Sequence, residues 1–194
     1  MKKDLTATVV GLIVLTLVLG LLYPLVVTGV SQVAFNDAAN GSQVKRDGRV
    51  VGSRLLGQSF NRPQYFHSRP SQSDYNPSAT FFSNAGPNGA DTRDTIAKAA
   101  KRYLKTEGGY DRTLTRAQIP PDAVQTSASG VDPQITPANA RIQAHRVAAV
   151  RGLAIDRVDQ LIDQNTDDRS LGLFGEPGVN VLQLNLALDK ETAR

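Results

Sequence analysis

The feature that most constrains this chain is a long run without charge near its N-terminus. No Asp, Glu, Lys or Arg occurs from Leu5 to Asn36, and Leu, Val, Gly and Thr dominate the run. A helix that crosses the hydrocarbon core of a bilayer needs about 20 apolar residues. A cleaved signal peptide has an apolar region of only about 7–15 residues, followed by a small-residue cleavage site. The sequence therefore predicts an uncleaved, single-pass transmembrane helix over residues 5–30.

The charges that flank this run predict its orientation. Lys2 and Lys3 directly precede the run, whereas Asp37 is the first charge after it and Lys45 comes later. Positively charged flanks stay on the cytoplasmic side of a membrane. We therefore expect a helix in the cytoplasmic (inner) membrane, with lipid as a partner. The remaining parts are then a cytoplasmic N-terminus (1–4), a linker (31–48) and an extracytoplasmic domain (49–194).

Composition excludes several classes of function. The 22 Lys and Arg against 18 Asp and Glu give a net charge of +4, which is too balanced to favour nucleic acid as a partner. The chain contains no Cys, which excludes thiol nucleophiles, thiolate metal ligands and disulfides. The domain after the span must therefore be held together by an apolar core.

Residue periodicity predicts the elements of that domain. Apolar residues at helical spacing favour helices from Asp91 or Thr92 to Glu107, from Thr136–Pro137 to Arg151, and from Asp156 to Asn165. Loose alternation over Arg49–Phe60 predicts one or two strands, and alternating leucines over Val179–Leu188 predict a half-buried strand. We predict a single α+β domain with a small sheet and about three helices.

Residues able to carry catalysis are sparse. His67 and His145 lie far apart in the sequence, and the chain has no GxSxG or GxxxxGK[ST] motif. We therefore expect no catalytic residue and no metal site. The alternative is a membrane-tethered extracytoplasmic hydrolase or solute-binding protein, for which His67, His145 and Asp132 are the candidate residues.

Three arginines recur along the helix that follows Thr136. Arg141, Arg146 and Arg151 do not fall on one narrow stripe of a helix, because residues ten apart differ by about 280° around its axis. A solvated helix face is the expected account of these arginines.

An aperiodic segment rich in aromatic residues precedes the first helix of the domain. Residues 61–88 contain many Pro, Ser and Asn residues together with five Tyr or Phe, so we expect an ordered loop and not a flexible linker. Such a loop either contacts a partner or packs over the core. The candidates for partner contact are Tyr65, Phe66, Arg69, Pro70, Ser71, Asn84, Gly86 and Asn88.

Short motifs in order along the whole chain resemble the KdpC family, the C subunits of Kdp potassium-transporting ATPases. They are Tyr23-Pro24-Leu25, Tyr65-Phe66 with Arg69-Pro70-Ser71, Ser83-Asn84 with Gly86-Pro87-Asn88, Ser129 to Ile135, Gln143 with Arg146, and Glu176-Pro177 with Val179 to Leu182. Each motif alone is weakly specific, whereas their shared order and spacing are specific.

The resemblance implies a non-catalytic accessory subunit of an ATP-driven, high-affinity potassium uptake complex. It implies a role in assembly and in coupling, or in raising the ATP affinity of the P-type ATPase subunit. The implied partners are that subunit, a channel-like potassium-translocating subunit and a small membrane peptide. The complex would handle ATP and potassium, and this chain would bind no cofactor stably.

Two consequences of the resemblance concern particular residues. Gln143 and Arg146 match a family segment that could be assigned to nucleotide, although packing on a helix surface is equally consistent. An outer domain could affect ATP binding only indirectly, through contacts that favour one conformation of the pump. In the membrane, close approach of a neighbouring helix would use Gly11, Gly20, Pro24 and Gly29.

Overall fold

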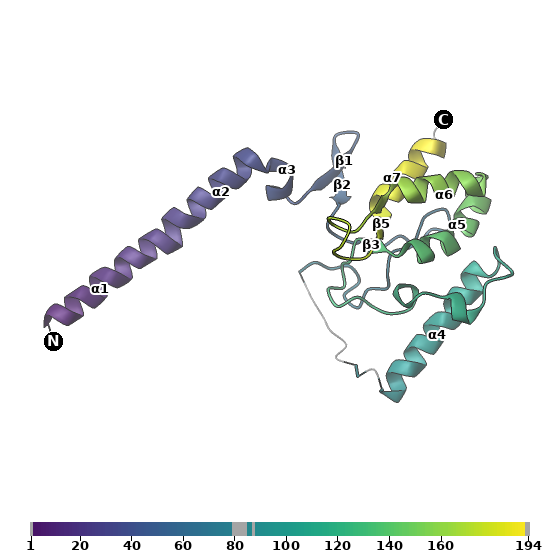
Figure 1. The fold of residues 1–194 in the computed structure, drawn as a ribbon, viewed down its shortest axis with the longest axis horizontal. Coiled ribbons are helices and arrows are strands. Elements are labelled where there is room, and N and C mark those ends of the chain that lie inside the picture. Colours follow the sequence, from purple (N-terminus) through teal and green to yellow (C-terminus); the bar gives the residue numbers. More distant parts are fainter. Residues whose placement is uncertain (1, 79–84, 87, 193–194) are drawn as a thin grey trace. The chain divides into compact units, whose positions relative to one another are not determined.

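The computed structural model describes residues 2–78, 85–86 and 88–192. Two compact units divide the chain, Met1–Val50 and Val51–Arg194 (Figure 1). The fold class is α+β, as predicted, because an apolar N-terminal helix is followed by a domain of helices with a small sheet.

The first unit is mainly one long helix. Its parts are α1 (Lys2–Leu17), the π-helical turn η1 (Val18–Leu22) and α2 (Tyr23–Ala34). The helix from Lys2 to Ala34 is 33 residues long and apolar enough to span a membrane. It extends beyond both ends of the predicted range 5–30.

A proline explains the π-helical turn in this helix. Pro24 has no backbone N–H, and its ring would clash with the carbonyl group one turn earlier, at Gly20. In the wider turn, the Tyr23 N–H donates to the Val18 carbonyl oxygen, five residues back. The distortion therefore lies where the sequence removes a helical hydrogen bond.

The segment 31–48, expected to be a linker, contains regular structure. It includes the end of α2, the short helix α3 (Asn36–Ala39) and the strand β1 (Gln43–Arg46), which pairs with β2 (Arg49–Ser53). Asp47 and Gly48 both have positive φ, at 51° and 76°. Asp-Gly suits the tight turn of a two-stranded hairpin, and this turn signal was not recognised in the sequence.

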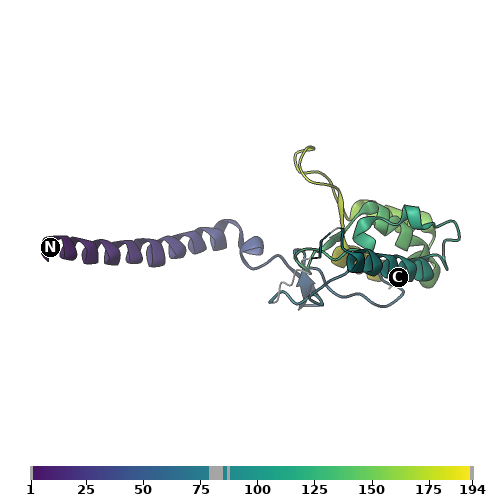
Figure 2. The same cartoon turned by 90° about the horizontal axis from the view of Figure 1, so that it is seen from below.

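In its described residues, the second unit combines four α-helices with a three-stranded antiparallel sheet (Figures 1 and 2). The helices are α4 (Ala90–Glu107), α5 (Pro137–Arg151), α6 (Ile155–Gln164) and α7 (Val181–Thr192), with the 3-10 turns η2 (Arg116–Gln118) and η3 (Pro121–Ala123). The strands, in spatial order, are β3 (Gln134–Ile135), β5 (Gly178–Asn180) and β4 (Thr166–Asp167).

The three predicted helices of the domain are confirmed as α4, α5 and α6. The Thr136 side chain caps α5 by accepting from the Asn139 N–H. Gly152 follows α5 with φ 67°, a left-handed conformation that glycine adopts without strain. Helix α4 begins at Ala90 after Gly89, so neither Asp91 nor Thr92 is its N-cap.

The prediction of a strand over Val179–Leu188 is wrong beyond its first residues. Only β5 is extended there, and α7 begins at Val181. Helix α7 buries Val181, Leu184, Asn185 and Leu188, which are spaced as one face of a helix. Asn185 is polar and so hides the helical period, leaving the alternating leucines as the more visible pattern.

The core of the domain lies between α5, α6, α7 and β5. Residues 61–78, the described first part of the segment rich in aromatic residues, are named the aromatic loop. Its Phe66 is fully buried in the core. Around Phe66 the core contains Val147, Val158, Ile162 and Leu188. A loop residue thus packs with residues of three helices, and this contact fixes the loop against the domain.

Candidate functional site

A buried ion pair joins α4 to α5. Arg146 and Glu107 are 1% and 2% exposed, and the Arg146 Nε lies 3.0 Å from Glu107 Oε1 and 3.1 Å from Oε2. The other guanidinium nitrogens donate to the Pro63 and Tyr65 carbonyl oxygens and to Gln143 Oε1. A buried charge is tolerated when it is paired and its hydrogen-bonding groups are satisfied. Arg146 therefore fixes both α4 and the aromatic loop to α5.

Two buried amide side chains hold the backbone of the same loop. Asn185 accepts from the Phe66 N–H at 2.8 Å and donates to the Phe66 carbonyl oxygen at 3.0 Å. Gln143 accepts from the His67 N–H at 2.7 Å and donates to the His67 carbonyl oxygen at 3.2 Å. Each amide imitates a strand partner, because it satisfies both backbone groups of one residue. We name these side chains, with Arg146 and Glu107, the loop frame.

Further polar residues extend the loop frame toward η3. The Gln143 amide donates to Asn139 Oδ1 at 3.0 Å, and the Tyr103 hydroxyl donates to the same oxygen at 2.8 Å. Asn139 in turn donates to Asp122 Oδ2 at 3.0 Å. Asp122 also accepts from the Thr136 N–H at 2.8 Å. The network thus connects α4, α5 and the turn at η3.

Burial controls the ionisation of the loop frame. Burial raises the pKa of the Glu107 carboxyl, and the Arg146 guanidinium opposes that rise. Burial raises the pKa of Tyr103, and the charges of Glu107 and Asp122 add to this effect. Burial and the nearby Arg146 charge lower the pKa of His67 from 6.5 to about 4. His67 is therefore neutral at physiological pH.

Arg151 supports the start of the aromatic loop from the end of α5. Its Nε donates to the Gln64 carbonyl oxygen at 2.7 Å, and its Nη2 lies 2.9 Å from Asp189 Oδ1 on α7. The guanidinium also lies over the Tyr65 ring, 5.0 Å from the ring centroid. One arginine thereby connects the loop, α5 and α7.

The later part of the loop is held by the segment before β3. Arg69 pairs with Asp132 at 3.0 Å, and Asp132 also accepts from the Ser129 hydroxyl at 2.5 Å. The Ser71 hydroxyl donates to the Gly130 carbonyl oxygen at 2.6 Å. Gly130 has φ 72°, a conformation suited to glycine. Two segments with family-like motifs are thus bound to each other.

A cleft of about 320 Å³ lies beside these residues. Its lining includes Arg69, Asp122, Asp132, Gln134 and Glu176. Each of the three carboxylates already accepts hydrogen bonds from protein groups: Asp122 from Thr136, Asp132 from Arg69, and Glu176 from Arg169. The carboxylates that line the cleft are therefore already hydrogen-bonded within the protein, which weakens the case for a solute site here.

The predicted contact residues fall into different surroundings. Phe66 is 0% exposed and belongs to the core, while Tyr65, Arg69, Pro70 and Ser71 are half-buried. Further along the chain, Gly86 and Asn88 are exposed, and Asn84 lies outside the described residues.

The expected solvated face of α5 is wrong for two of its three arginines. Arg146 is buried and the Arg151 side chain is 6% exposed, whereas the Arg141 side chain is 59% exposed. The polar atoms of Gln143 and Arg146, the candidates for nucleotide, are engaged within the domain. The spacing of the arginines could not reveal this, because their partners come from distant parts of the chain.

The remaining candidates are placed as follows. His145 Nε2 lies 4.0 Å from Asp111 Oδ2 at a partly exposed position, and His67 Nε2 lies 3.3 Å from the Arg62 carbonyl oxygen. Within the described residues, no three His, Asp or Glu side chains gather as a metal site would require. In the N-terminal helix, a Cβ added at Gly11 or Gly29 would meet open space.

Sequence reasoning missed Glu107 and Asn185 of the loop frame. Glu107 precedes Gly108-Gly109 at a helix end, where an acidic residue gives no sign of burial. Asn185 lies among leucines, and a polar residue at a helical core position was the available signal.

Comparison with known proteins places the chain in a family. The family described as "KdpC: K+-transporting ATPase, c chain" matches residues 5–190. The Potassium-transporting ATPase KdpC subunit of Paraburkholderia phytofirmans is 47% identical over 193 residues, covering 98% of both chains. The subunit of the same name from Mycobacterium tuberculosis (strain ATCC 25618 / H37Rv) is 44% identical over 192 residues, covering 98% of this chain and 100% of that protein. On this match over nearly its whole length, the chain belongs to the KdpC family of potassium-transporting ATPase subunits.

Proposed function

We propose that this chain is a non-catalytic accessory subunit of an ATP-driven potassium uptake complex. It supports assembly of the complex and raises the ATP affinity of the P-type ATPase subunit from the outer side of the cytoplasmic membrane. Its partners are that subunit, the channel-like potassium-translocating subunit and the small membrane peptide. The family match over residues 5–190 carries this proposal.

The loop frame supports an indirect route to ATP. Gln143 and Arg146 use their polar atoms to hold the His67 and Tyr65 backbone. Breaking these bonds to contact a nucleotide would leave buried backbone groups of the loop without partners. If the Arg146 guanidinium also turned away from Glu107, it would leave that carboxylate as a buried, unpaired charge. The domain instead acts as a rigid body that binds one conformation of the pump better than another.

The uncrowded surroundings of two glycines in the N-terminal helix support a role in assembly. Because a Cβ at Gly11 or Gly29 meets nothing within 4 Å, a larger side chain there leaves this helix undisturbed. It would, however, obstruct close packing by a neighbouring membrane helix.

Substitution of these glycines therefore tests the proposed assembly role. Gly11→Leu and Gly29→Leu, each co-expressed with the companion subunits, should lower the amount of complex recovered in mild detergent. Val14→Leu, at an already exposed apolar position, is the matched control and should assemble normally. Full recovery of the complex with both glycine variants would contradict close packing of this helix.

The absence of cysteine allows a direct test of orientation. A thiol introduced by Thr113→Cys in the domain should react with a membrane-impermeant maleimide in intact cells. A thiol introduced by Asp4→Cys, which keeps both lysines that precede the helix, should react only after the cells are permeabilised. The reverse pattern would place the domain in the cytoplasm and remove the indirect mechanism.

The effect on ATP is tested by the kinetics of the complex. Potassium-stimulated ATP hydrolysis should show a higher KM for ATP when this chain is omitted from the co-expressed complex. An unchanged KM in a complex that still assembles would reject the proposed effect on ATP affinity.

A further inference from the structure

The connection between β4 and β5 carries large apolar side chains into solvent. Leu171, Leu173 and Phe174 are 86%, 77% and 65% exposed. Figure 2 shows this yellow-green loop extending away from the helices of the domain. We name residues 168–175 the apolar loop. Clustered apolar side chains with a polar surround mark interaction sites on protein surfaces.

The apolar loop has a defined backbone. The Ser170 N–H donates to the Phe174 carbonyl oxygen at 2.8 Å, and the Phe174 N–H donates to the Ser170 carbonyl oxygen at 2.9 Å. Its stem is closed by an ion pair between Arg169 and Glu176 at 2.8 Å, and β4 and β5 anchor it to the sheet. The apolar residues are therefore held out on a hydrogen-bonded turn.

Leu171 adopts a conformation that its side chain disfavours. Its φ is 53°, a region that non-glycine residues rarely adopt because the Cβ approaches the backbone. Gly172, the next residue, has φ 73°. Strained residues of this kind concentrate in segments that clamp ligands. Because the Leu171 side chain is in water, its burial within the isolated domain does not offset this backbone strain.

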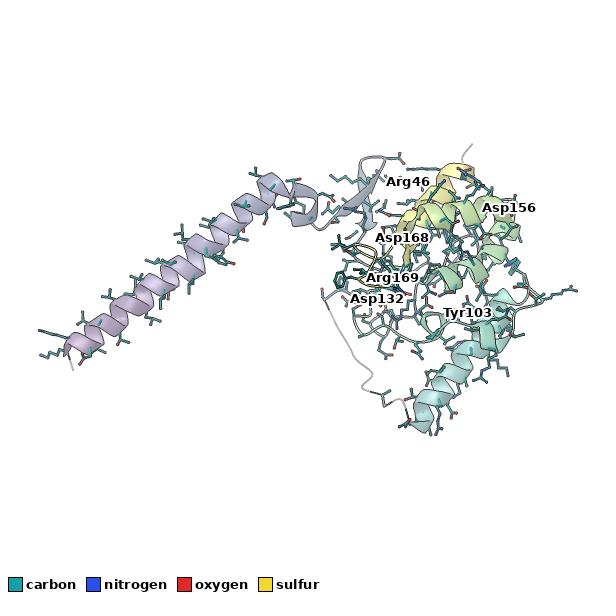
Figure 3. All side chains as sticks on the ribbon, viewed as in Figure 1. Arg46, Tyr103, Asp132, Asp156, Asp168 and Arg169 are labelled. Carbon is teal, nitrogen blue, oxygen red and sulfur yellow. The ribbon has the colours of Figure 1, made fainter. Side chains whose placement is uncertain are left out.

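The charges beside the loop indicate which partner fits. Three acidic residues flank or begin the loop in the sequence, namely Asp167, Asp168 and Glu176, and Arg169 is the one basic residue of this stretch. Arg169 pairs with Glu176, and Figure 3 labels Asp168 and Arg169. Anionic lipid headgroups would repel these acidic side chains. The same side chains are complementary to a protein surface in which lysine or arginine side chains surround an apolar socket.

We propose that the apolar loop inserts Leu171, Leu173 and Phe174 into an apolar socket, rimmed with basic side chains, on a companion protein subunit. This inference rests on the proposed function, because it needs a transport complex to supply the partner. Anchored apolar side chains that fill a pocket carry most of the binding energy of an interface. The acidic side chains at the foot of the loop fix its position by pairing with the basic side chains around the socket.

Thiol accessibility tests the location of the loop directly. Phe174→Cys provides the only thiol of this chain, since the natural sequence has no Cys. The rate of maleimide labelling is measured for the full chain alone in lipid vesicles and for the chain in the assembled complex. Assembly should slow labelling by about tenfold or more if the socket buries this residue.

A control thiol distinguishes local protection from a general effect. Asp156, in the first turn of α6, is exposed, and Figure 3 shows it well separated from Asp168 and Arg169. Asp156→Cys should react equally fast in both states. Equal rates for Phe174→Cys in an intact complex would overturn the socket while leaving the proposed function standing. Protection in vesicles that contain the chain alone would instead identify the bilayer as the occupant and also overturn it.

Charge substitutions test the rim. Asp168→Lys should weaken recovery of the complex at low salt, and the difference from the natural chain should shrink as salt rises. Asp156→Lys is the matched control and should have no such effect. Folding is checked by the midpoint of thermal unfolding of the full chain. Asp168→Lys should leave it unchanged, and Asp156→Lys should lower it only slightly, because the first turn of α6 loses its acidic residue. A salt-independent loss, or none, would contradict a basic rim.

Discussion

Two long loops of the domain are ordered by opposite means. The aromatic loop has its backbone bonded to side chains from distant helices, among them Arg146 and Asn185. The apolar loop bonds mainly to its own backbone, between Ser170 and Phe174. Buried backbone groups must find partners inside the protein, whereas exposed ones can use water. The first loop therefore needs the rest of the fold, while the second leaves its side chains free for a partner.

This difference also separates stability from function. Substitutions in the loop frame should unfold the domain, because they strand polar groups in the core. Substitutions at the tip of the apolar loop should alter association and leave unfolding almost unchanged. A family-like motif is thus no guide, by itself, to which residues contact a partner.

The largest effect is expected from removing the central guanidinium. Arg146→Ala leaves Glu107 buried without its charge partner and should lower the free energy of unfolding by about 3–5 kcal/mol. Arg141→Ala, on the same helix but in an exposed ion pair, should cost less than about 1 kcal/mol. Urea denaturation of the full chain in detergent measures both. Similar losses for the two variants would mean that Arg146 does not hold the frame.

The next effect concerns the backbone of Phe66. Asn185→Leu keeps the number and branching of the side-chain heavy atoms but removes both hydrogen bonds to Phe66. It should destabilise the domain by about 2–3 kcal/mol. Lys190→Ala, at an exposed position of α7, serves as control and should change stability by less than about 0.5 kcal/mol. Thermal unfolding distinguishes the two; an unaffected Asn185 variant would show that the loop is held without this amide.

The half-buried imidazole of His67, whose backbone the loop frame holds, gives the stability of the domain a pH dependence. Burial and Arg146 lower the pKa of His67 from 6.5 to about 4, so the unfolded chain takes up a proton first as pH falls. The free energy of unfolding should be unaffected by His67 above pH 6.5 and should decrease as pH drops from 6.5 to about 4. The loss due to His67 is about 2 kcal/mol, since its ring is partly exposed.

Comparison with a variant isolates this contribution from other acid-dependent groups. His67→Gln removes the titrating group but keeps the backbone bonds to Gln143. Denaturant titrations across that pH range should show a shallower decline for the variant. Parallel pH profiles would mean that His67 has the same proton affinity in both states.

The smallest effect is expected at the strained leucine. Leu171→Gly relieves a left-handed backbone conformation worth roughly 1 kcal/mol, and the added freedom of the unfolded chain offsets much of this gain. Thermal unfolding should therefore change little, while recovery of the complex falls. Leu173→Gly has no such strain to relieve and should be the less stable of the two. A clear loss of stability for Leu171→Gly would place its side chain in the fold of the domain.

The two loops also differ in how far their roles were predictable. Aromatic residues identified the first as ordered, but its fixing by Glu107 and Asn185 depends on contacts between residues far apart in sequence. The leucines and phenylalanine of the second resemble core residues in sequence, and only their exposure reveals otherwise. Periodicity located α4, α5 and α6, yet it misassigned α7, because a buried Asn185 interrupts the apolar pattern.

The sequence by itself determined the apolar helix, the family and the approximate boundaries of α4, α5 and α6. These follow from local composition and from short-range rules: hydrophobic length, the Thr136 cap, and glycine after a helix. Tertiary structure alone decided which polar residues are buried and which apolar residues are exposed. Arg146 is buried because Glu107 and loop carbonyls converge on it, while Phe174 is exposed because the turn holding it projects from the sheet. Both depend on chain segments meeting in space, which no local pattern encodes.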